Sequence, residues 1–129
     1  MDCKDLIADG FSRVTRILDM SLKDLTREQL TYRPSEQANS VAWLAWHLTR
    51  VQDHHLSGLA GTEQAWLAAG WHTKFGKPAD PQDTGQKYTP EQVAAIAPSS
   101  AQLLLDYHHA VADRSSAYVN SLSGVLGVV

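Results

Sequence analysis

Histidine is the residue type in this sequence that is best suited to chemistry. Six histidines occur among 129 residues, and neutral imidazole is both a common ligand of divalent metals and a proton carrier near pH 7. His47 and His108 lie on or beside the apolar stripes of long helical segments, which predicts that both face the interior and could bind one metal ion. The other four are His54, His55, His72 and His109.

The depth of the two histidines in their segments supports this prediction. His47 lies about eight residues into its segment and His108 about nine residues into its own. If the two helices run parallel, the imidazoles lie at similar depth and can converge. His55 follows His47 by about 12 Å along the helix axis, so we do not expect those two to share a metal.

A structural role for these histidines is the alternative. The sequence contains no HExxH, no Cys-x-x-Cys and no Glu-x-x-His pattern that would mark a metal site locally. A histidine on the buried face of a helix is more often hydrogen-bonded to a neighbour than bound to a metal. Trp43, Trp46 and Tyr107 could also line a small-molecule pocket, an idea supported by composition alone. Asp53 is given no role.

Three segments show the helical period that must position these residues, at about 5–25, 40–59 and 99–122. Asn39 or Ser40 can cap the second segment, and Ser99 with Gln102 has the spacing of a capping box for the third. The stripe of the second segment consists of Val41, Leu44, Leu48, Val51, His55 and Leu59. The stripe of the third consists of Leu104, His108, Val111, Ser115, Tyr118 and Leu122.

The connection between the second and third segments, residues 61–98, is far longer than a helical hairpin needs. Short helices are expected at Glu63–Ala69 and after Thr89, with a loop over 76–87 between them. Such a long crossover lets the two flanking helices run parallel. Because no alternating strand pattern appears, the sequence predicts an all-α fold in a single domain, 1–129.

Composition excludes several classes of protein. The net charge of −3 provides no electrostatic surface for nucleic acid, and no apolar run is long enough to span a membrane. The N-terminus lacks the features of a secretory signal. One cysteine, Cys3, cannot form an internal disulfide, so we expect a cytoplasmic protein.

The segment Asn39–Asp53, with the sequence NSVAWLAWHLTRVQD, resembles the DinB-like superfamily. The resemblance is strongest to its actinobacterial branch of small proteins, related to mycothiol-dependent maleylpyruvate isomerases and bacillithiol transferases. It implies an up-down-down-up four-helix bundle with a long link between helices two and three. It also implies a divalent metal, zinc or nickel, held by three histidines, of which His47 matches the one on helix two. A low-molecular-weight thiol is the implied co-substrate.

The sequence departs from that family at its C-terminal end. The remaining histidine ligands usually lie on a fourth helix, whereas here the chain continues from Leu122 as SGVLGVV with no further histidine. We expect three main helices, and either a truncated family member or a second subunit that fills the gap; a homodimer is the structural prediction. From its depth in the helix alone, His108 is the candidate for a second metal ligand or for a residue that hydrogen-bonds to a ligand. Two functions stay open: a metal-dependent thiol transferase or isomerase, and a non-catalytic dimerisation or partner-binding module.

Overall fold

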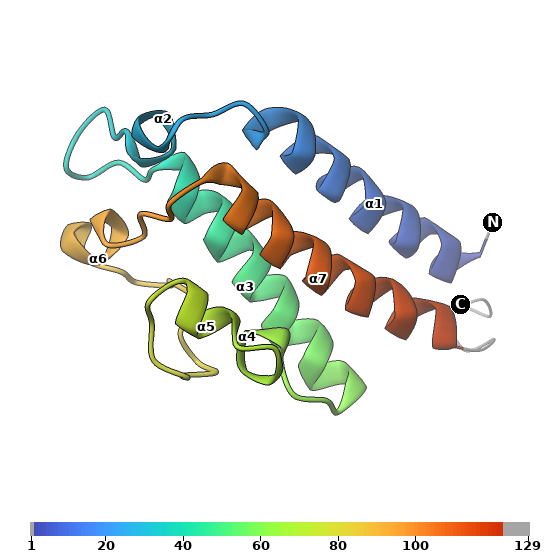
Figure 1. Cartoon of the computed structure of the whole chain (residues 1–129). Coiled ribbons are helices and arrows are strands. Elements are labelled where there is room, and N and C mark those ends of the chain that lie inside the picture. The colour runs from blue at the N-terminus through green and yellow to red at the C-terminus, as the bar shows by residue number, and fades with distance from the viewer. Residues whose placement is uncertain (1, 123–129) are drawn as a thin grey trace.

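The computed structural model describes residues 2–122 and contains seven helices and no strand within that range (Figure 1). The predicted all-α fold is therefore confirmed. Three long helices dominate, α1 (Cys3–Leu22), α3 (Val41–Ala60) and α7 (Ala101–Ser121). The short ones are α2 (Arg27–Thr31), α4 (Ala65–Ala68), α5 (Trp71–Lys74) and α6 (Pro90–Ala94).

The long helices lie side by side, with α7 packed against both α1 and α3. Figure 1 shows α3 and α7 running in the same direction and α1 running in the opposite one. The segment that carries α4, α5 and α6 returns the chain from the end of α3 to the level at which α3 began. This is the predicted up-down-down order with a long crossover.

Helix ends follow local capping chemistry. The Ser40 hydroxyl accepts from the backbone N–H of Trp43 at 3.0 Å, and Gly61 ends α3 in the left-handed conformation. Complete capping boxes start α2 at Thr26 and α6 at Thr89. The capping box predicted for α7 at Ser99 is wrong, since Ser100 is the N-cap and its side chain accepts no bond from the helix.

Helix α7 buries the first four positions of the stripe that its sequence predicts, whereas Tyr118 and Leu122 are half-buried. Leu104, His108, Val111 and Ser115 are all buried, because α1 and α3 cover two sides of this helix. The buried face of α7 is therefore the part of the core that the helical period of the sequence predicted.

The orientation of α3 differs from the prediction. Leu44 is 50% exposed and Leu59 is 71% exposed, whereas Trp46 is fully buried. Since the crossover and α7 cover the opposite side of α3, the aliphatic stripe is left outside. The buried face of the helix comprises Ala42, Trp43, Ala45, Trp46, Thr49, Arg50, Gln52, Asp53 and Ser57.

An apolar groove runs between α1 and α3 where the outward stripes of the two helices meet. Its volume is about 280 Å³. The residues lining it are Phe11, Val14, Leu48, Val51, Gln52, His55 and Leu56. The predicted lack of a fourth helix concerns residues 123–129, which lie outside the described residues.

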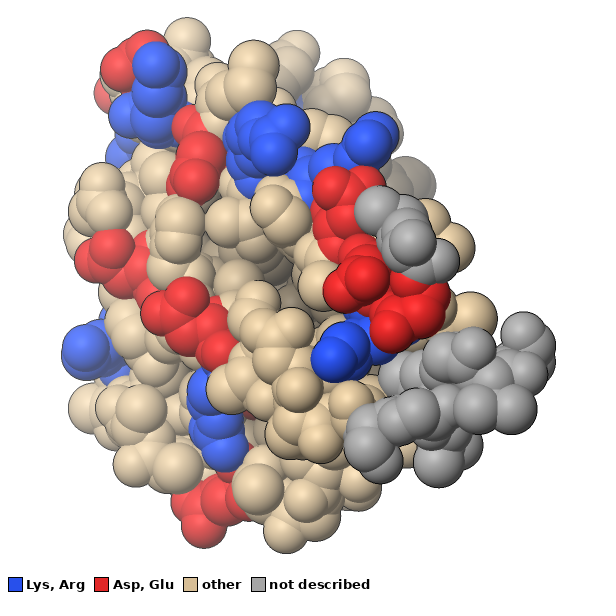
Figure 2. Space-filling model, turned by 90° about the vertical axis from the view of Figure 1, so that its right-hand side faces the viewer, with Lys and Arg blue, Asp and Glu red and all other residues tan. Residues whose placement is uncertain are grey.

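The surface at the end of the bundle where α1 begins and α7 ends carries charges of both signs. Figure 2 shows acidic and basic side chains interspersed there, with uncharged surface between them. Charge alone therefore marks no dominant binding surface at this end. None of the helices that the structure describes combines the length and apolar character needed to span a bilayer.

Candidate functional site

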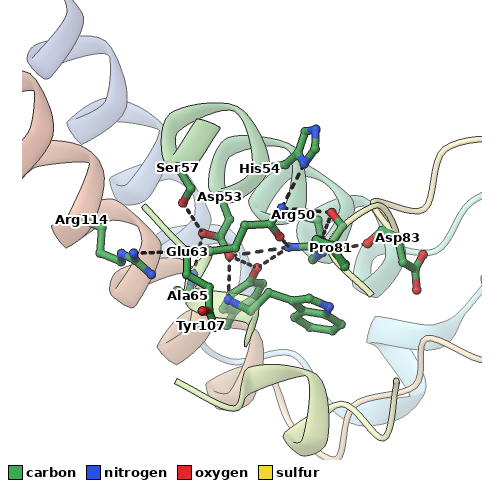
Figure 3. Close-up of polar contacts among 12 residues, drawn as sticks. Arg50, Asp53, His54, Ser57, Glu63, Ala65, Pro81, Asp83, Tyr107 and Arg114 are labelled. Carbon is green, nitrogen blue, oxygen red and sulfur yellow. Dashed lines mark hydrogen bonds and ion pairs between the residues drawn. The ribbon is translucent and has the colours of Figure 1, made fainter. Parts of the chain in front are cut away.

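The centre of the molecule holds a buried ion pair between Arg50 and Asp53, both on α3 (Figure 3). The guanidinium and the carboxylate lie 3.6 Å apart, and both side chains are almost completely shielded from solvent. Charges so deeply buried are tolerated only when further hydrogen bonds satisfy them. The surrounding contacts supply those bonds.

Asp53 connects α3 to α4 and α7. Its carboxylate accepts from the backbone N–H groups of Ala65 and Trp66, each at 2.9 Å, and from the Tyr107 hydroxyl at 2.8 Å. Because the N-cap residue of α4 provides no side-chain bond of its own, a carboxylate from another helix caps this one. Burial, followed by the charge of Asp53, raises the pKa of Tyr107, so its hydroxyl stays protonated and can donate.

Arg50 fastens the crossover to α3. It donates to the carbonyl oxygens of Asp83 at 2.8 Å and Pro81 at 3.2 Å, and to the Gln64 side-chain oxygen at 2.7 Å. Its guanidinium also lies 4.6 Å from the centre of the Trp66 ring. These bonds commit Arg50 to holding the loop, which makes it a structural clamp.

His47 lies at the edge of this clamp. Its ring stacks on Trp43 with centroids 4.5 Å apart and planes 12° from parallel. Nδ1 contacts the carbonyl oxygen of Thr84, the residue after the clamped Asp83. A carbonyl only accepts, so Nδ1 carries the hydrogen and Nε2 holds the lone pair. Nε2 makes no hydrogen bond to any residue from 2 to 122, and metal-binding histidines are commonly oriented by such a carbonyl.

His108 occupies a different environment, between two threonines. Nδ1 lies 2.9 Å from Oγ1 of Thr49, and Nε2 lies 3.0 Å from Oγ1 of Thr15. Each threonine hydroxyl also lies within hydrogen-bond distance of a backbone carbonyl, Thr49 of Ala45 at 2.9 Å and Thr15 of Phe11 at 3.2 Å, and a neutral ring donates through one nitrogen and accepts through the other. Both ring nitrogens of His108 are thus used within the core, which favours a structural role.

The two predicted ligands do not share a contact. His47 faces the crossover, whereas His108 joins α7 to α1 and α3. Among the described residues, no group of three or more His, Cys, Asp or Glu side chains could hold a metal ion. Of the two predicted ligands, only His47 keeps a ring nitrogen without a hydrogen bond to residues 2–122, and these residues form no complete metal centre.

The remaining sequence candidates are engaged elsewhere. His54 Nδ1 lies 3.0 Å from the side-chain amide of Gln64, and exposed His109 lies 2.7 Å from a carboxylate oxygen of Asp19. Trp46 and Tyr107 are fully buried. They therefore belong to the core and do not line an open pocket.

Sequence reasoning missed the roles of Arg50 and Asp53. One signal could have revealed them: Trp46, Arg50, Asp53 and Ser57 recur at steps of four, three and four, the period of one helix face. The buried face of α3 therefore consists largely of aromatic and polar residues, whereas the prediction followed the aliphatic stripe.

Stability should fall in acid because of His108. Burial is the main reason that its pKa drops to about 4 from the ordinary 6.5, with the neighbouring His109 adding to the effect and Asp19 opposing it. The unfolded chain thus binds a proton first as the pH falls from about 6.5 to about 4. Over this range we expect a loss on the order of 2–3 kcal/mol, measured by urea unfolding.

The histidine variants isolate this contribution from that of the carboxylates. His108→Gln should lose less stability than the unchanged chain between those pH values, whereas His55→Gln should retain the full dependence, because His55 is exposed on α3 and is not among the groups that shift the pKa of His108. Identical pH profiles for the unchanged chain and His108→Gln would contradict the assignment.

Comparisons with known proteins place this chain in a family. The sequence model of the DinB superfamily matches residues 11–126. A solved structure described as a conserved protein from Enterococcus faecalis aligns with a TM-score of 0.85 and 27% identity, over 95% of this chain and 72% of that one. No curated protein matches the sequence. The match over most of the chain, on the helical architecture described above, shows that the protein belongs to the DinB superfamily.

Proposed function

We propose that the protein binds a divalent cation, zinc or nickel, through Nε2 of His47 and acts as a thiol-dependent transferase or isomerase. The observation that supports this is the bond from His47 Nδ1–H to the carbonyl oxygen of Thr84, which leaves Nε2 as the nitrogen with a lone pair. A bound cation would favour the thiolate form of a low-molecular-weight thiol, its reactive form.

The chain's own residues orient His47. Trp43 stacks on one face of the ring, and Arg50 fixes the backbone of Asp83 beside the accepting Thr84. His108 has no place in the proposal, because its two nitrogens are already bonded to threonines. Because the described residues of one chain contain no group of three ligands, the remaining ligands would come from a second copy or from the thiol itself.

Calorimetric titration of the untagged protein with zinc and nickel tests the metal proposal. We expect stoichiometric binding by the unchanged chain and at least a tenfold weaker affinity for His47→Ala. His109→Ala is the matched control, since it removes an exposed histidine of α7 whose ring contacts Asp19 on α1, and it should bind normally. Equal binding by the His47 variant and the unchanged chain would refute the proposal.

We also propose a second candidate, self-association through the groove between α1 and α3. The evidence is the apolar lining of the groove, which Phe11 and Val14 supply from α1 and Leu48, Val51 and Leu56 supply from α3. Monomeric proteins rarely leave a contiguous apolar patch of this kind uncovered. A second copy offers the same face, and a two-fold axis would set the two faces against each other.

Light scattering at micromolar concentration tests the dimer. The unchanged chain should have twice the monomer mass, and Leu48→Glu should shift it to the monomer by placing a charge in the groove. Tyr32→Gln, at an exposed position that does not line the groove, should remain dimeric. A monodisperse, folded monomer of the unchanged chain would rule this candidate out. Metal binding without dimerisation would favour the thiol-dependent enzyme. Dimerisation without metal binding would favour the non-catalytic dimerisation module.

A further inference from the structure

A cleft separate from His47 lies between the second half of α3 and the second half of α7. Its volume is about 380 Å³, and Thr62, just after the end of α3, contributes to its rim. This size lies toward the lower end of the range for small-molecule pockets, roughly 300–1,000 Å³. We propose that this cleft binds a small amphipathic anion, one with an apolar body and a single anionic head.

The walls of the cleft suit an apolar body. Leu56 and Ala60 contribute from α3, and Val111, Ala117 and Tyr118 contribute from α7. Small side chains at 60 and 117 leave room between the helices for a flat or short-chain group. Burying such a group against these side chains would contribute roughly 25 cal/mol per Å² of apolar surface removed from water.

Arg114 provides the positive charge for the anionic head and is the only cationic residue among residues 2–122 that lines the cleft. It extends from α7 toward the segment after α3 (Figure 3), where Nη2 donates to the carbonyl oxygen of Glu63 and, at 3.4 Å, to the Thr62 hydroxyl. Nε and Nη1 make no hydrogen bond to the described residues. A guanidinium held on one edge in this way can offer its other N–H groups to a carboxylate as a bidentate pair.

The buried acid in the lining does not repel an anion. Asp53 is paired with Arg50 and accepts from Tyr107, from two backbone N–H groups and from Ser57. Its charge is therefore compensated inside the protein. Arg114 forms no ion pair with any residue that the structure describes, and its charge favours an anion over a neutral or cationic molecule.

The inference is independent of the proposed metal site, and a pair of isosteric probes tests it. The uniformly ¹⁵N-labelled full chain would be titrated with 3-phenylpropionate and with the neutral 3-phenylpropanol at low salt, following amide shifts. We expect the acid to bind at least tenfold more tightly than the alcohol, with shifts at residues 56–62 and 111–118. His47→Ala should bind both probes as the unchanged chain does.

Three variants complete the design. Arg114→Gln should remove the preference for the acid, while Arg13→Gln, which alters an exposed ion pair on α1, should keep it. Ala117→Leu fills the cleft without touching the charge and should weaken both probes, so the proposal stays testable if the Arg114 variant unfolds. Equal binding of acid and alcohol by the unchanged chain, shifts confined to other regions, or no binding at millimolar concentration would overturn it.

Discussion

Replacing Asp53 with alanine is expected to lower the free energy of unfolding by about 3–5 kcal/mol. The substitution leaves the guanidinium of Arg50 buried without its counter-ion. It also leaves the first N–H groups of α4 and the Tyr107 hydroxyl without their acceptor. Removing one partner of a buried charged pair costs more than the pair itself contributes, because the other partner stays desolvated.

Chemical denaturation monitored by circular dichroism measures this effect. Asp106→Ala is the matched control: the residue is also an aspartate that bonds a side chain, but it lies on the exposed face of α7. The free energy of unfolding of Asp106→Ala should stay within about 0.5 kcal/mol of that of the unchanged chain. A loss below about 1 kcal/mol for Asp53→Ala would mean that the network does not hold the crossover in place.

Replacing Gly85 with alanine is expected to be the second large perturbation, costing about 2–4 kcal/mol. Gly85 has a φ of +86°, and a Cβ built there would lie 2.7 Å from Cζ3 of Trp46 and 3.0 Å from Nε1 of Trp43. Both indole rings are buried, so neither can move aside easily. The same atom would lie 3.4 Å from Nδ1 of His47.

Gly76→Ala separates backbone strain from steric overlap. Gly76 has a similar φ of +68°, but an added Cβ would meet nothing within 4 Å. Its cost should be about 1–2 kcal/mol, from the left-handed backbone alone. If the two variants proved equally stable by denaturant unfolding, the close packing of the loop on Trp46 would be disproved. In the His47 proposal, Gly85→Ala should also weaken zinc binding.

Features that depend on near neighbours in the chain were predictable from the sequence. The hydroxyl cap at Ser40, one of the two candidates, and the helix start at Thr89 were identified from residue types at fixed spacings. The bonds involved join residues three apart, so the required partners can be seen in the sequence itself. The buried stripe of α7 was predictable for a related reason, since helices cover it on two sides.

The direction in which α3 faces was not predictable in the same way. Its sequence carries two stripes, one aliphatic and one containing Trp46, Arg50 and Asp53, and hydrophobicity favours the aliphatic one. The crossover decides between them, because its Ala65 and Trp66 N–H groups and its Pro81 and Asp83 carbonyls satisfy the buried charges. Those partners lie 12 to 33 residues away in the chain.

By itself, the sequence determined an all-helical chain, the approximate bounds of its three long helices and membership of the DinB superfamily, with His47 on the matching helix. Only the tertiary structure decided that His108 bonds to two threonines, that Asp53 anchors the crossover, and that the aliphatic side of α3 faces a groove. The reason is physical: periodicity shows that a helix has an apolar side, whereas the identity of what covers that side depends on contacts between residues distant in the chain.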